Sequence, residues 1–230
     1  MGCVYESLLY YFKINCMMHI CFDWDGTLAK PDVAREASSR RGKWLSVGSD
    51  HEYLKVAQKT NVHYNLYREA LEKYTGVSDK KLLTEMMTNI FQIHYLSVVH
   101  ELQEKIFYDG ILTLLAMLKK ENHTLSIAST LRLDIIEPVL ISLDKKQFFS
   151  KIYANTPDLS FEKDYLVKLA NEYGTLHFMV GDKEEDLLAG KRVHAKTVFV
   201  SWGAGDLTHP ELADYVVNTP QELANVLLKQ

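Results

Sequence analysis

Met18-His-Ile-Cys-Phe-Asp-Trp-Asp-Gly-Thr-Leu28 is the most informative stretch of this 230-residue chain. Its short apolar run ends in two aspartates, Asp23 and Asp25, and a Gly-Thr turn follows. An apolar run of this length that is bounded by a turn signal is typical of a buried strand. Carboxylates beside an apolar core are costly unless a cation or a proton balances their charge. The stretch therefore predicts a strand with a candidate metal and nucleophile site at its carboxyl end.

The composition is that of an ordinary globular chain, with 47% hydrophobic and 24% charged residues. Such a length suits one large domain, or a domain with a second one inserted. A net charge of -4 gives no electrostatic reason to expect binding to nucleic acid or to a membrane. Cys3, Cys16 and Cys21 match no zinc pattern and make a poor disulfide framework. We therefore expect a cytoplasmic protein.

Residues 1–17 precede the first predicted strand as a leader. Their apolar run, Leu8-Leu-Tyr-Tyr-Phe12, is too short to span a bilayer. The leader also lacks the basic start and small-residue cleavage site of a signal peptide. Because Met17 and Met18 stand directly before the strand, we expect 1–17 to be a dispensable extension. An added first strand or helix is the alternative.

Residues 30–105 show helical spacing and no convincing strand. Gly76 is predicted to stop one helix and Ser78 to cap the start of the next. The polar segment 31–50 is less periodic and is expected to form a short helix and a loop. Its basic residues are expected to form a solvated face, namely Arg35, Arg40, Arg41 and Lys43. The apolar positions that define the helical stripes are Tyr64, Tyr67, Leu71, Tyr74, Leu83, Met86, Met87, Ile90, Phe91, Tyr95, Val98, Val99 and Leu102.

From residue 106 onward, predicted strands alternate with predicted helices. The strands are expected at 124–128, 151–154, 177–180, 197–200 and 215–217, and a capping box at Thr219 opens the last helix. This alternation is typical of a parallel sheet covered on both faces. The sequence therefore predicts an α/β, Rossmann-like core formed by 18–29 and 106–230, with an all-helical insertion at 30–105.

Several polar residues follow the predicted strands. Asp23 and Asp25 end the first strand, Ser129-Thr130 the second, and Gly181-Asp182 the strand 177–180, with Asp186 four residues further on. Lys163 lies at the start of a predicted helix. Because the carboxyl ends of parallel strands share one edge of a sheet, these groups can converge.

Phosphoryl transfer is the chemistry that needs such a set. Carboxylates of Asp23 and Asp182 are suitable ligands for a divalent cation. Asp23 can attack phosphorus, and Asp25 can protonate the leaving oxygen and later take a proton from water. Ser129 and Lys163 can hold the phosphoryl oxygens as their charge grows.

The ordered motifs resemble those of the haloacid dehalogenase-like hydrolase superfamily, in its phosphatase branch with a helical cap after the first motif. They are Asp23-Trp-Asp-Gly-Thr27, Ser129, Lys163 and Gly181-Asp-Lys-Glu-Glu-Asp186. The resemblance covers about 18–29 and 106–230. It implies that Asp23 is the nucleophile and that Asp25 is the acid/base.

The resemblance also implies a ligand set. The metal, Mg²⁺, would be held by Asp23, Asp182 and the backbone carbonyl of Asp25, with Asp186 ligating it or orienting its water. Trp24 would offer its backbone N–H to phosphate, with its ring at the edge of the site. The full set of expected phosphate-binding residues is Trp24, Gly26, Ser129, Thr130 and Lys163.

Two features depart from the family pattern. Lys163 is followed by Asp164 where relatives often have proline, which leaves Lys168 as a weaker alternative. The segment after Thr27 lacks the acidic-Ser/Thr pair of many sugar-phosphate members, which slightly disfavours a phosphomutase.

We therefore expect a magnesium-dependent phosphatase that hydrolyses the phosphomonoester of a small metabolite through an aspartyl phosphate. Phosphoglycolate is the first candidate substrate, by analogy. A phosphomutase and a non-catalytic protein that binds a phosphorylated ligand are the alternatives, whereas Asp25 disfavours a dehalogenase. We expect a monomer or a homodimer.

Overall fold

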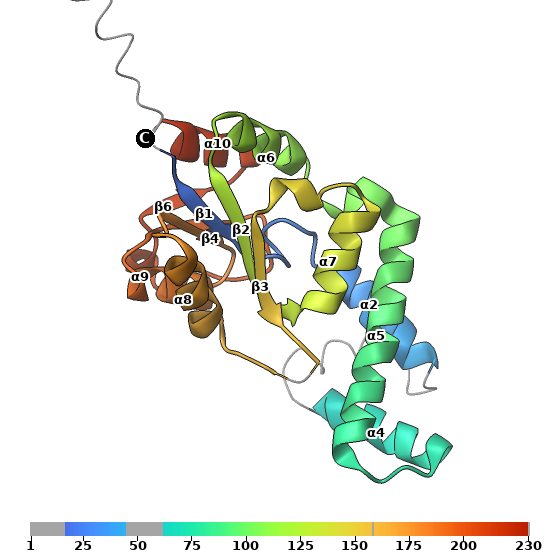
Figure 1. Cartoon of the computed structure of the whole chain (residues 1–230). Coiled ribbons are helices and arrows are strands. Elements are labelled where there is room, and N and C mark those ends of the chain that lie inside the picture. The colour runs from blue at the N-terminus through green and yellow to red at the C-terminus, as the bar shows by residue number, and fades with distance from the viewer. Residues whose placement is uncertain (1–16, 45–61, 158, 230) are drawn as a thin grey trace, which may run out of the picture.

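A computed structural model describes residues 17–44, 62–157 and 159–229 of the chain. Its centre is one sheet of six parallel strands in the order β3-β2-β1-β4-β5-β6 (Figure 1). The strands are β1 His19–Phe22, β2 Thr124–Arg132, β3 Lys151–Asn155, β4 Phe178–Gly181, β5 Lys196–Val200 and β6 Tyr215–Val217. The predicted α/β, Rossmann-like fold is confirmed, and β1 lies in the middle of the sheet, between β2 and β4.

Helices cover both faces of this sheet (Figure 1). On one face, α8 and α9 pack against a cluster that includes Cys21 and Met179. On the other face, α6, α7 and α10 close a larger core that includes Ile20 and Phe22. These helices are α6 Ile111–Lys120, α7 Leu133–Ser142, α8 Lys163–Tyr173, α9 Glu184–Arg192 and α10 Pro220–Leu228. Successive side chains of a strand alternate between faces, so the near-continuous apolar run of β1 is explained by burial on both sides.

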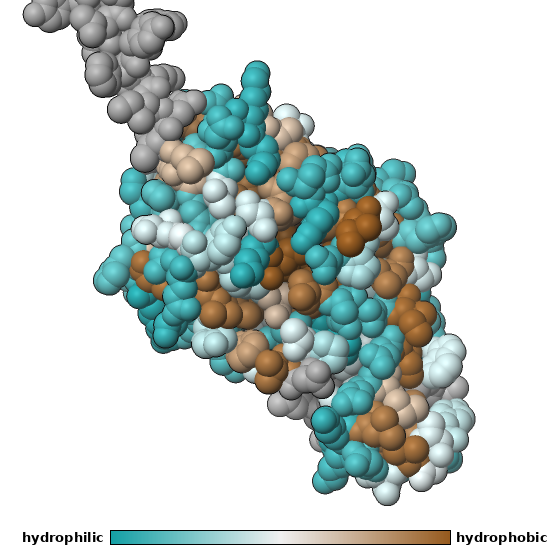
Figure 2. Space-filling model, viewed as in Figure 1, coloured by the Kyte–Doolittle hydropathy of each residue, from teal (hydrophilic) through white to brown (hydrophobic). Residues whose placement is uncertain are grey.

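In the part of the chain that the structure describes, the segment between β1 and β2 also contains, before α6, the helices α2 Asp32–Trp44, α4 Val62–Thr75 and α5 Lys80–Leu102. Figure 1 shows α2 alongside α5, with α4 at the end of α5 that is farther from the sheet. The second half of α5 belongs to the main core, whereas its first half packs with α4 in a small separate core. Figure 2 shows this distal part as a lobe that projects from the body. The single helix α5 therefore connects the lobe rigidly to the sheet.

Two details of these helices differ from the prediction. The N-cap of α5 is Asp79 and not Ser78, because the Asp79 carboxylate accepts the Leu82 N–H at 2.9 Å. Arg41 is only 8% exposed and lies 4.6 Å from the centre of the Tyr67 ring, so it is not part of a solvated face. A guanidinium is weakly hydrated and stacks well on aromatic rings, which lets α2 bury it.

The predicted end of α4 and start of the last helix are confirmed, with one change. Gly76 follows α4 with a positive φ of 69°, as a left-handed stop requires. Thr219 caps α10 by accepting the Glu222 N–H at 3.1 Å. The Glu222 carboxylate, however, accepts the N–H of Asn218 and not that of Thr219.

Part of the prediction lies outside the described residues, namely the leader up to residue 16 and the loop expected at 45–50. Within the ranges described, none of the helices combines the length and the apolar character that crossing a membrane requires.

Candidate active site

Three aspartates predicted as a set lie together at the carboxyl edge of the sheet. Asp23 follows β1, Asp182 follows β4, and Asp186 lies in the first turn of α9. The Asp23 N–H donates to the Val180 carbonyl at 2.9 Å, which brings the ends of β1 and β4 together. One carboxylate oxygen from each aspartate lies within 4.8 Å of the others, and all three residues are buried. The topology therefore builds a compact cluster of oxygen donors.

Lys163 supplies the positive charge of this cluster. Its ammonium contacts Asp23 Oδ1, lies 2.8 Å from Asp186 Oδ1, and donates to the Ala128 carbonyl at 2.9 Å. Burial alone would lower the pKa of Lys163, but the neighbouring Asp23 and Asp186 raise it above its ordinary value. The alternative Lys168 is 64% exposed and pairs with Glu172 at 3.8 Å. The geometry therefore selects Lys163.

A loop after β5 holds one oxygen of Asp182. Asp182 Oδ2 accepts the N–H groups of Ala204 and Gly205 at 2.9 and 3.1 Å. Gly26 approaches the same carboxylate with a φ of 90°, and a Cβ at Gly26 would overlap it. Asp182 Oδ1 is buried without a hydrogen-bond partner among the described protein atoms. One oxygen of Asp182 is thus fixed and the other is unsatisfied within a cluster of carboxylates.

The charges of the cluster do not balance. Burial, followed by the charge of Asp23, raises the pKa of both Asp182 and Asp186 above the ordinary value. Three buried carboxylates face the single buried ammonium of Lys163. Hard oxygen donors with excess negative charge are what Mg²⁺ prefers, and the unsatisfied Asp182 oxygen points to the same use. The residues present therefore fit a divalent cation.

Ser129 and Thr130 at the end of β2 face different surroundings. Ser129 is buried and its Oγ accepts the Leu131 N–H at 3.2 Å, which leaves its own hydroxyl proton free to be donated. It directly follows Ala128, the carbonyl partner of Lys163. Thr130 is exposed and lines a separate cavity of about 330 Å³ between α5 and the ends of β2 and β3. The main chain of Ser129 therefore follows directly on a contact of the cluster, whereas Thr130 lines the separate cavity.

Trp24, which lies between the two aspartates of the first motif, reaches toward the inserted helices. The Trp24 ring is fully buried, packs edge-on against Phe107, and donates from Nε1 to the Tyr95 hydroxyl at 2.9 Å. The core encloses the ring that was expected at the edge of the site, and the ring donates to the same Tyr95 hydroxyl that contacts Asp25. The Gly26 N–H donates to the Ala29 carbonyl at 2.8 Å, and this hydrogen bond closes the turn that follows β1.

Asp25 is half-buried beside this group. Burial, followed by the charge of Asp23, raises the pKa of Asp25 to about 7. Its Oδ1 accepts a hydrogen bond from the Tyr95 hydroxyl at 3.4 Å. A carboxyl group with a pKa near neutrality can both give and take a proton at physiological pH.

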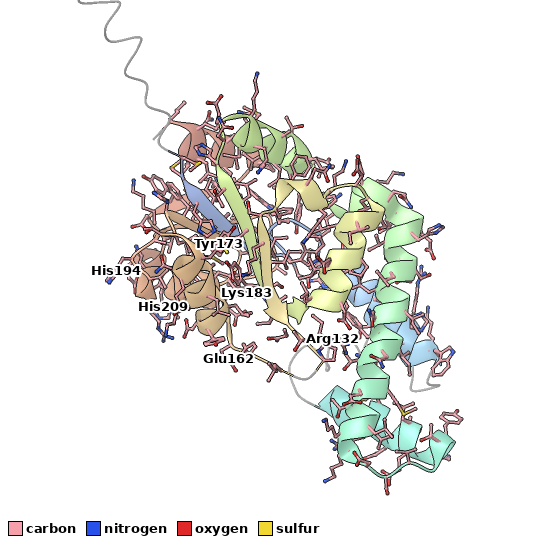
Figure 3. The ribbon with its side chains drawn as sticks, in the orientation of Figure 1. Arg132, Glu162, Tyr173, Lys183, His194 and His209 are labelled. Atoms are coloured by element: carbon pink, nitrogen blue, oxygen red, sulfur yellow. The ribbon has the colours of Figure 1, made fainter. Side chains whose placement is uncertain are left out.

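The prediction missed three contributors to the site. Tyr95 was placed only on an apolar helix stripe, and Lys183 was not singled out, although it lies at the carboxyl ends of the strands (Figure 3). The N–H donors at 204 and 205 were also missed. Gly203-Ala-Gly205, directly after a strand, is a sequence signal that could have indicated them.

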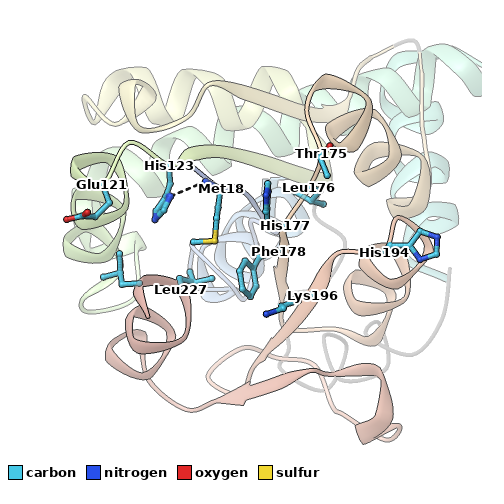
Figure 4. Close-up of a pocket in the computed structure, with 11 residues that line it drawn as sticks. Met18, Glu121, His123, Thr175, Leu176, His177, Phe178, His194, Lys196 and Leu227 are labelled. Carbon is cyan, nitrogen blue, oxygen red and sulfur yellow. Dashed lines mark hydrogen bonds between the residues drawn. The ribbon is translucent and has the colours of Figure 1, made fainter. Parts of the chain in front are cut away.

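The opposite edge of the sheet carries another cavity, of about 440 Å³ (Figure 4). It lies at the amino ends of the strands, where the Met18 N–H donates to His123 Nδ1 at 3.2 Å. Its lining residues include none of the aspartates, Ser129 or Lys163. This cavity is therefore separate from the candidate chemistry at the carboxyl edge.

Comparisons with known proteins agree with this geometry. Residues 20–200 match the family model described as "Haloacid dehalogenase-like hydrolase". A phosphoglycolate phosphatase from Aquifex aeolicus is 25% identical over 227 residues, which cover 92% of this chain and 97% of that protein.

Solved structures share the fold at lower identity. A haloacid dehalogenase-like family protein from Streptococcus pneumoniae has 20% identity and a TM-score of 0.64, and the match covers 92% of this chain and 98% of that one. CbbY from Rhodobacter sphaeroides, solved in complex with xylulose-1,5-bisphosphate, has 18% identity and a TM-score of 0.66, with 90% and 96% covered.

Proposed function

The chain belongs to the haloacid dehalogenase-like hydrolase family, and from this premise we propose that it is a magnesium-dependent phosphatase of small phosphomonoesters. The observation that carries the proposal is the buried cluster of Asp23, Asp182 and Asp186 around the Lys163 ammonium. A nucleophilic carboxylate, a cation site and a buried ammonium in one place are what phosphoryl transfer to an aspartate requires. The similarity to a phosphoglycolate phosphatase supports the same activity.

We assign the metal to Asp23, Asp182 and the backbone carbonyl of Asp25, with Asp186 as a further ligand or as the group that orients a water. When bound, Mg²⁺ would neutralise the charge on the transferring phosphoryl oxygens. The amides of Ala204 and Gly205 hold one oxygen of Asp182 and so direct the other toward the cluster.

Asp23 is the proposed nucleophile. One of its carboxylate oxygens attacks phosphorus as the bond between phosphorus and the ester oxygen breaks. Asp25 donates its proton to that leaving oxygen, and the alcohol departs. Water then attacks the phosphorus of the aspartyl phosphate, Asp25 takes a proton from it, and inorganic phosphate is released with Asp23 regenerated. The pKa of about 7 at Asp25 suits both proton transfers.

Ser129 and Lys163 are the proposed phosphate-binding side chains. The Ser129 hydroxyl has a proton to donate, and Lys163 is held beside it through the Ala128 carbonyl. Trp24 and Gly26 would contribute backbone N–H groups, although that of Gly26 now serves the turn. Thr130 lines the neighbouring cavity, so its contact would be with another part of the substrate.

We assign the choice of substrate to a cap formed by residues 30–105. Thr84, Thr88 and Phe91 of α5 line the 330 Å³ cavity opposite the ends of β2 and β3. This cavity is lined by Thr130, the residue after Ser129 in the chain, and it is small, which favours a compact metabolite over a polymer. Phosphoglycolate is the first candidate, because the relative from Aquifex aeolicus carries that activity in its name.

The experiment is to measure phosphate release from a panel of phosphate esters that includes phosphoglycolate and p-nitrophenyl phosphate. We expect hydrolysis with Mg²⁺, its loss with a chelator, and its loss in Asp23→Asn. Asp164→Asn is the matched control, because Asp164 lies in the first turn of α8 and is not a member of the cluster.

The outcomes separate the candidate functions. Activity that survives both the chelator and Asp23→Asn would contradict the mechanism. Isomerisation of a sugar phosphate without phosphate release would indicate a phosphomutase. Binding of phosphate esters without turnover would indicate a non-catalytic protein.

A further inference from the structure

The phenol of Tyr95 links the inserted helix α5 to the first motif. Tyr95 is fully buried, and its hydroxyl accepts the indole N–H of Trp24 at 2.9 Å. The same hydroxyl lies 3.4 Å from Oδ1 of Asp25. Trp24 and Asp25 flank the same peptide after β1, whereas Tyr95 lies 70 residues away from Asp25 in the chain. One hydroxyl group therefore joins α5 to both residues.

The chemistry of the three groups fixes the direction of these hydrogen bonds. An indole nitrogen can only donate, so the Tyr95 oxygen must accept from Trp24. The single O–H proton of Tyr95 is then free for Asp25 Oδ1, which accepts it whether or not the carboxyl group carries a proton on its other oxygen. With Oδ1 engaged in this way, Oδ2 is the oxygen that is left to exchange a proton with substrate or water.

The surroundings of Tyr95 allow little freedom. Its ring packs against Phe91, with ring centres 5.8 Å apart, and Trp24 packs against Phe107 at 6.0 Å. Val98 and Val99 of the same helix are buried in the main core. Within the described residues, the Tyr95 hydroxyl is the side-chain group that donates a hydrogen bond to the Asp25 carboxylate. Such contacts are often long without substrate and tighten in the reacting complex.

We propose that Tyr95 is a positioning residue, which through its hydrogen bonds to Trp24 and Asp25 orients the Asp25 carboxyl group toward the leaving oxygen of the substrate. This inference rests on the proposed phosphatase function. The helix α5 then not only lines a cavity but also orients the acid/base residue Asp25. Because the contact crosses from α5 to the β1 turn, the acid is correctly placed only when α5 is seated on the sheet.

The test uses the dependence of the rate on the leaving group. An ester with a good leaving group, such as p-nitrophenyl phosphate, needs little protonation, whereas phenyl phosphate and alkyl phosphates need the acid more. We expect Tyr95→Phe to lower kcat/KM about tenfold or more for the poor leaving groups, as loss of a hydrogen bond to a carboxylate permits. The effect on p-nitrophenyl phosphate should be less than about threefold, with KM nearly unchanged.

A double-mutant cycle and a control complete the experiment. In an Asp25→Asn background, Tyr95→Phe should have no further effect on the poor leaving groups. Tyr67→Phe, which alters another buried tyrosine of the inserted helices, should leave the leaving-group dependence unchanged.

Three results would count against the account in different ways. An equal loss with every ester, or a full additional loss in the Asp25→Asn background, would overturn the positioning role alone. A wild-type protein that hydrolyses none of the esters with Mg²⁺ would overturn the proposed function together with it.

Discussion

The Lys163 ammonium lies 2.8 Å from Oδ1 of Asp186 and also contacts Asp23, and all three side chains are at least nine-tenths buried. Removal of one partner from a buried ion pair leaves the other charges uncompensated, which costs about 3–5 kcal/mol in typical proteins. We therefore expect Lys163→Met to lower the free energy of unfolding by about 3 kcal/mol in the presence of chelator. Urea unfolding measures this change.

A matched variant and a metal titration sharpen that prediction. Lys168→Met should change stability by less than about 0.5 kcal/mol, because Lys168 is on the surface and its pair with Glu172 is exposed. Mg²⁺ should restore part of the stability of Lys163→Met, since a cation can replace the missing charge. Equal effects of the two substitutions would contradict the assignment of Lys163 to the cluster.

Metal binding should be visible without catalysis. Ligand at about 100 times its Kd stabilises a folded protein by about 2.7 kcal/mol, which is several degrees in Tm for a chain of this size. We expect this shift in Tm when Mg²⁺ is added to the unmodified protein. We expect no such shift in Asp182→Asn, because the substitution removes the negative charge of the carboxylate whose Oδ1 lacks a protein partner. Asp164→Asn should keep the shift. A Tm of the unmodified protein that does not change when Mg²⁺ is added would contradict the cation site.

Arg132 is the cationic residue that lines the cavity beside Thr130, and Figure 3 shows it at the end of β2. Its guanidinium is held by the Asp134 carboxylate, with Nε 2.8 Å from Oδ1. We expect Arg132→Gln to raise KM about tenfold for phosphoglycolate, whose carboxylate is a second anionic group, and to raise KM less for p-nitrophenyl phosphate, which lacks such a group. Arg192→Gln is the control, because Arg192 lies on the surface at the end of α9. Equal changes in KM for both substrates would contradict this role.

His19 makes the stability depend on pH. It is 5% exposed, between the Gly174 carbonyl and the Ser126 hydroxyl, and burial lowers its pKa below the ordinary 6.5. The unfolded chain therefore binds a proton near pH 6.5 that the folded protein binds only at lower pH. Stability should fall as pH decreases below about 6.5, and should be unaffected by this group above it.

The pH dependence can be assigned by substitution. His19→Gln should reduce the loss of stability between about pH 7 and pH 5. His209 should act in the opposite sense, because its hydrogen bond to Glu184 raises its pKa, so that its contribution is present at low pH and is lost as pH rises. Urea unfolding at several pH values measures both. An unchanged pH dependence in His19→Gln would exclude this histidine as the cause.

The sequence predicted the features that depend on local pattern. Apolar runs and helical spacing gave the strand–helix alternation, and the ordered motifs gave Asp23, Lys163 and Asp182. Parallel strand ends meet at one edge, so topology alone brought these residues together.

The features that were missed depend on tertiary contacts. Tyr95 is one apolar position on a helix stripe, and nothing in its spacing shows that its hydroxyl reaches Trp24 and Asp25. Arg41 is buried because its guanidinium packs against two aromatic rings from other helices, Tyr67 and Phe91. Such pairings arise from how α2, α4 and α5 pack, which periodicity does not specify.

We propose that Asp23 carries the phosphoryl group during turnover. The direct measurement is to quench turnover of a labelled phosphate ester with acid, digest the protein, and locate the labelled residue by mass spectrometry. We expect label on Asp23 that forms with Mg²⁺ and is absent from Asp23→Asn, whereas Asp164→Asn should be labelled as the unmodified protein is. Label on another residue, or turnover by Asp23→Asn at the rate of the unmodified protein, would contradict it.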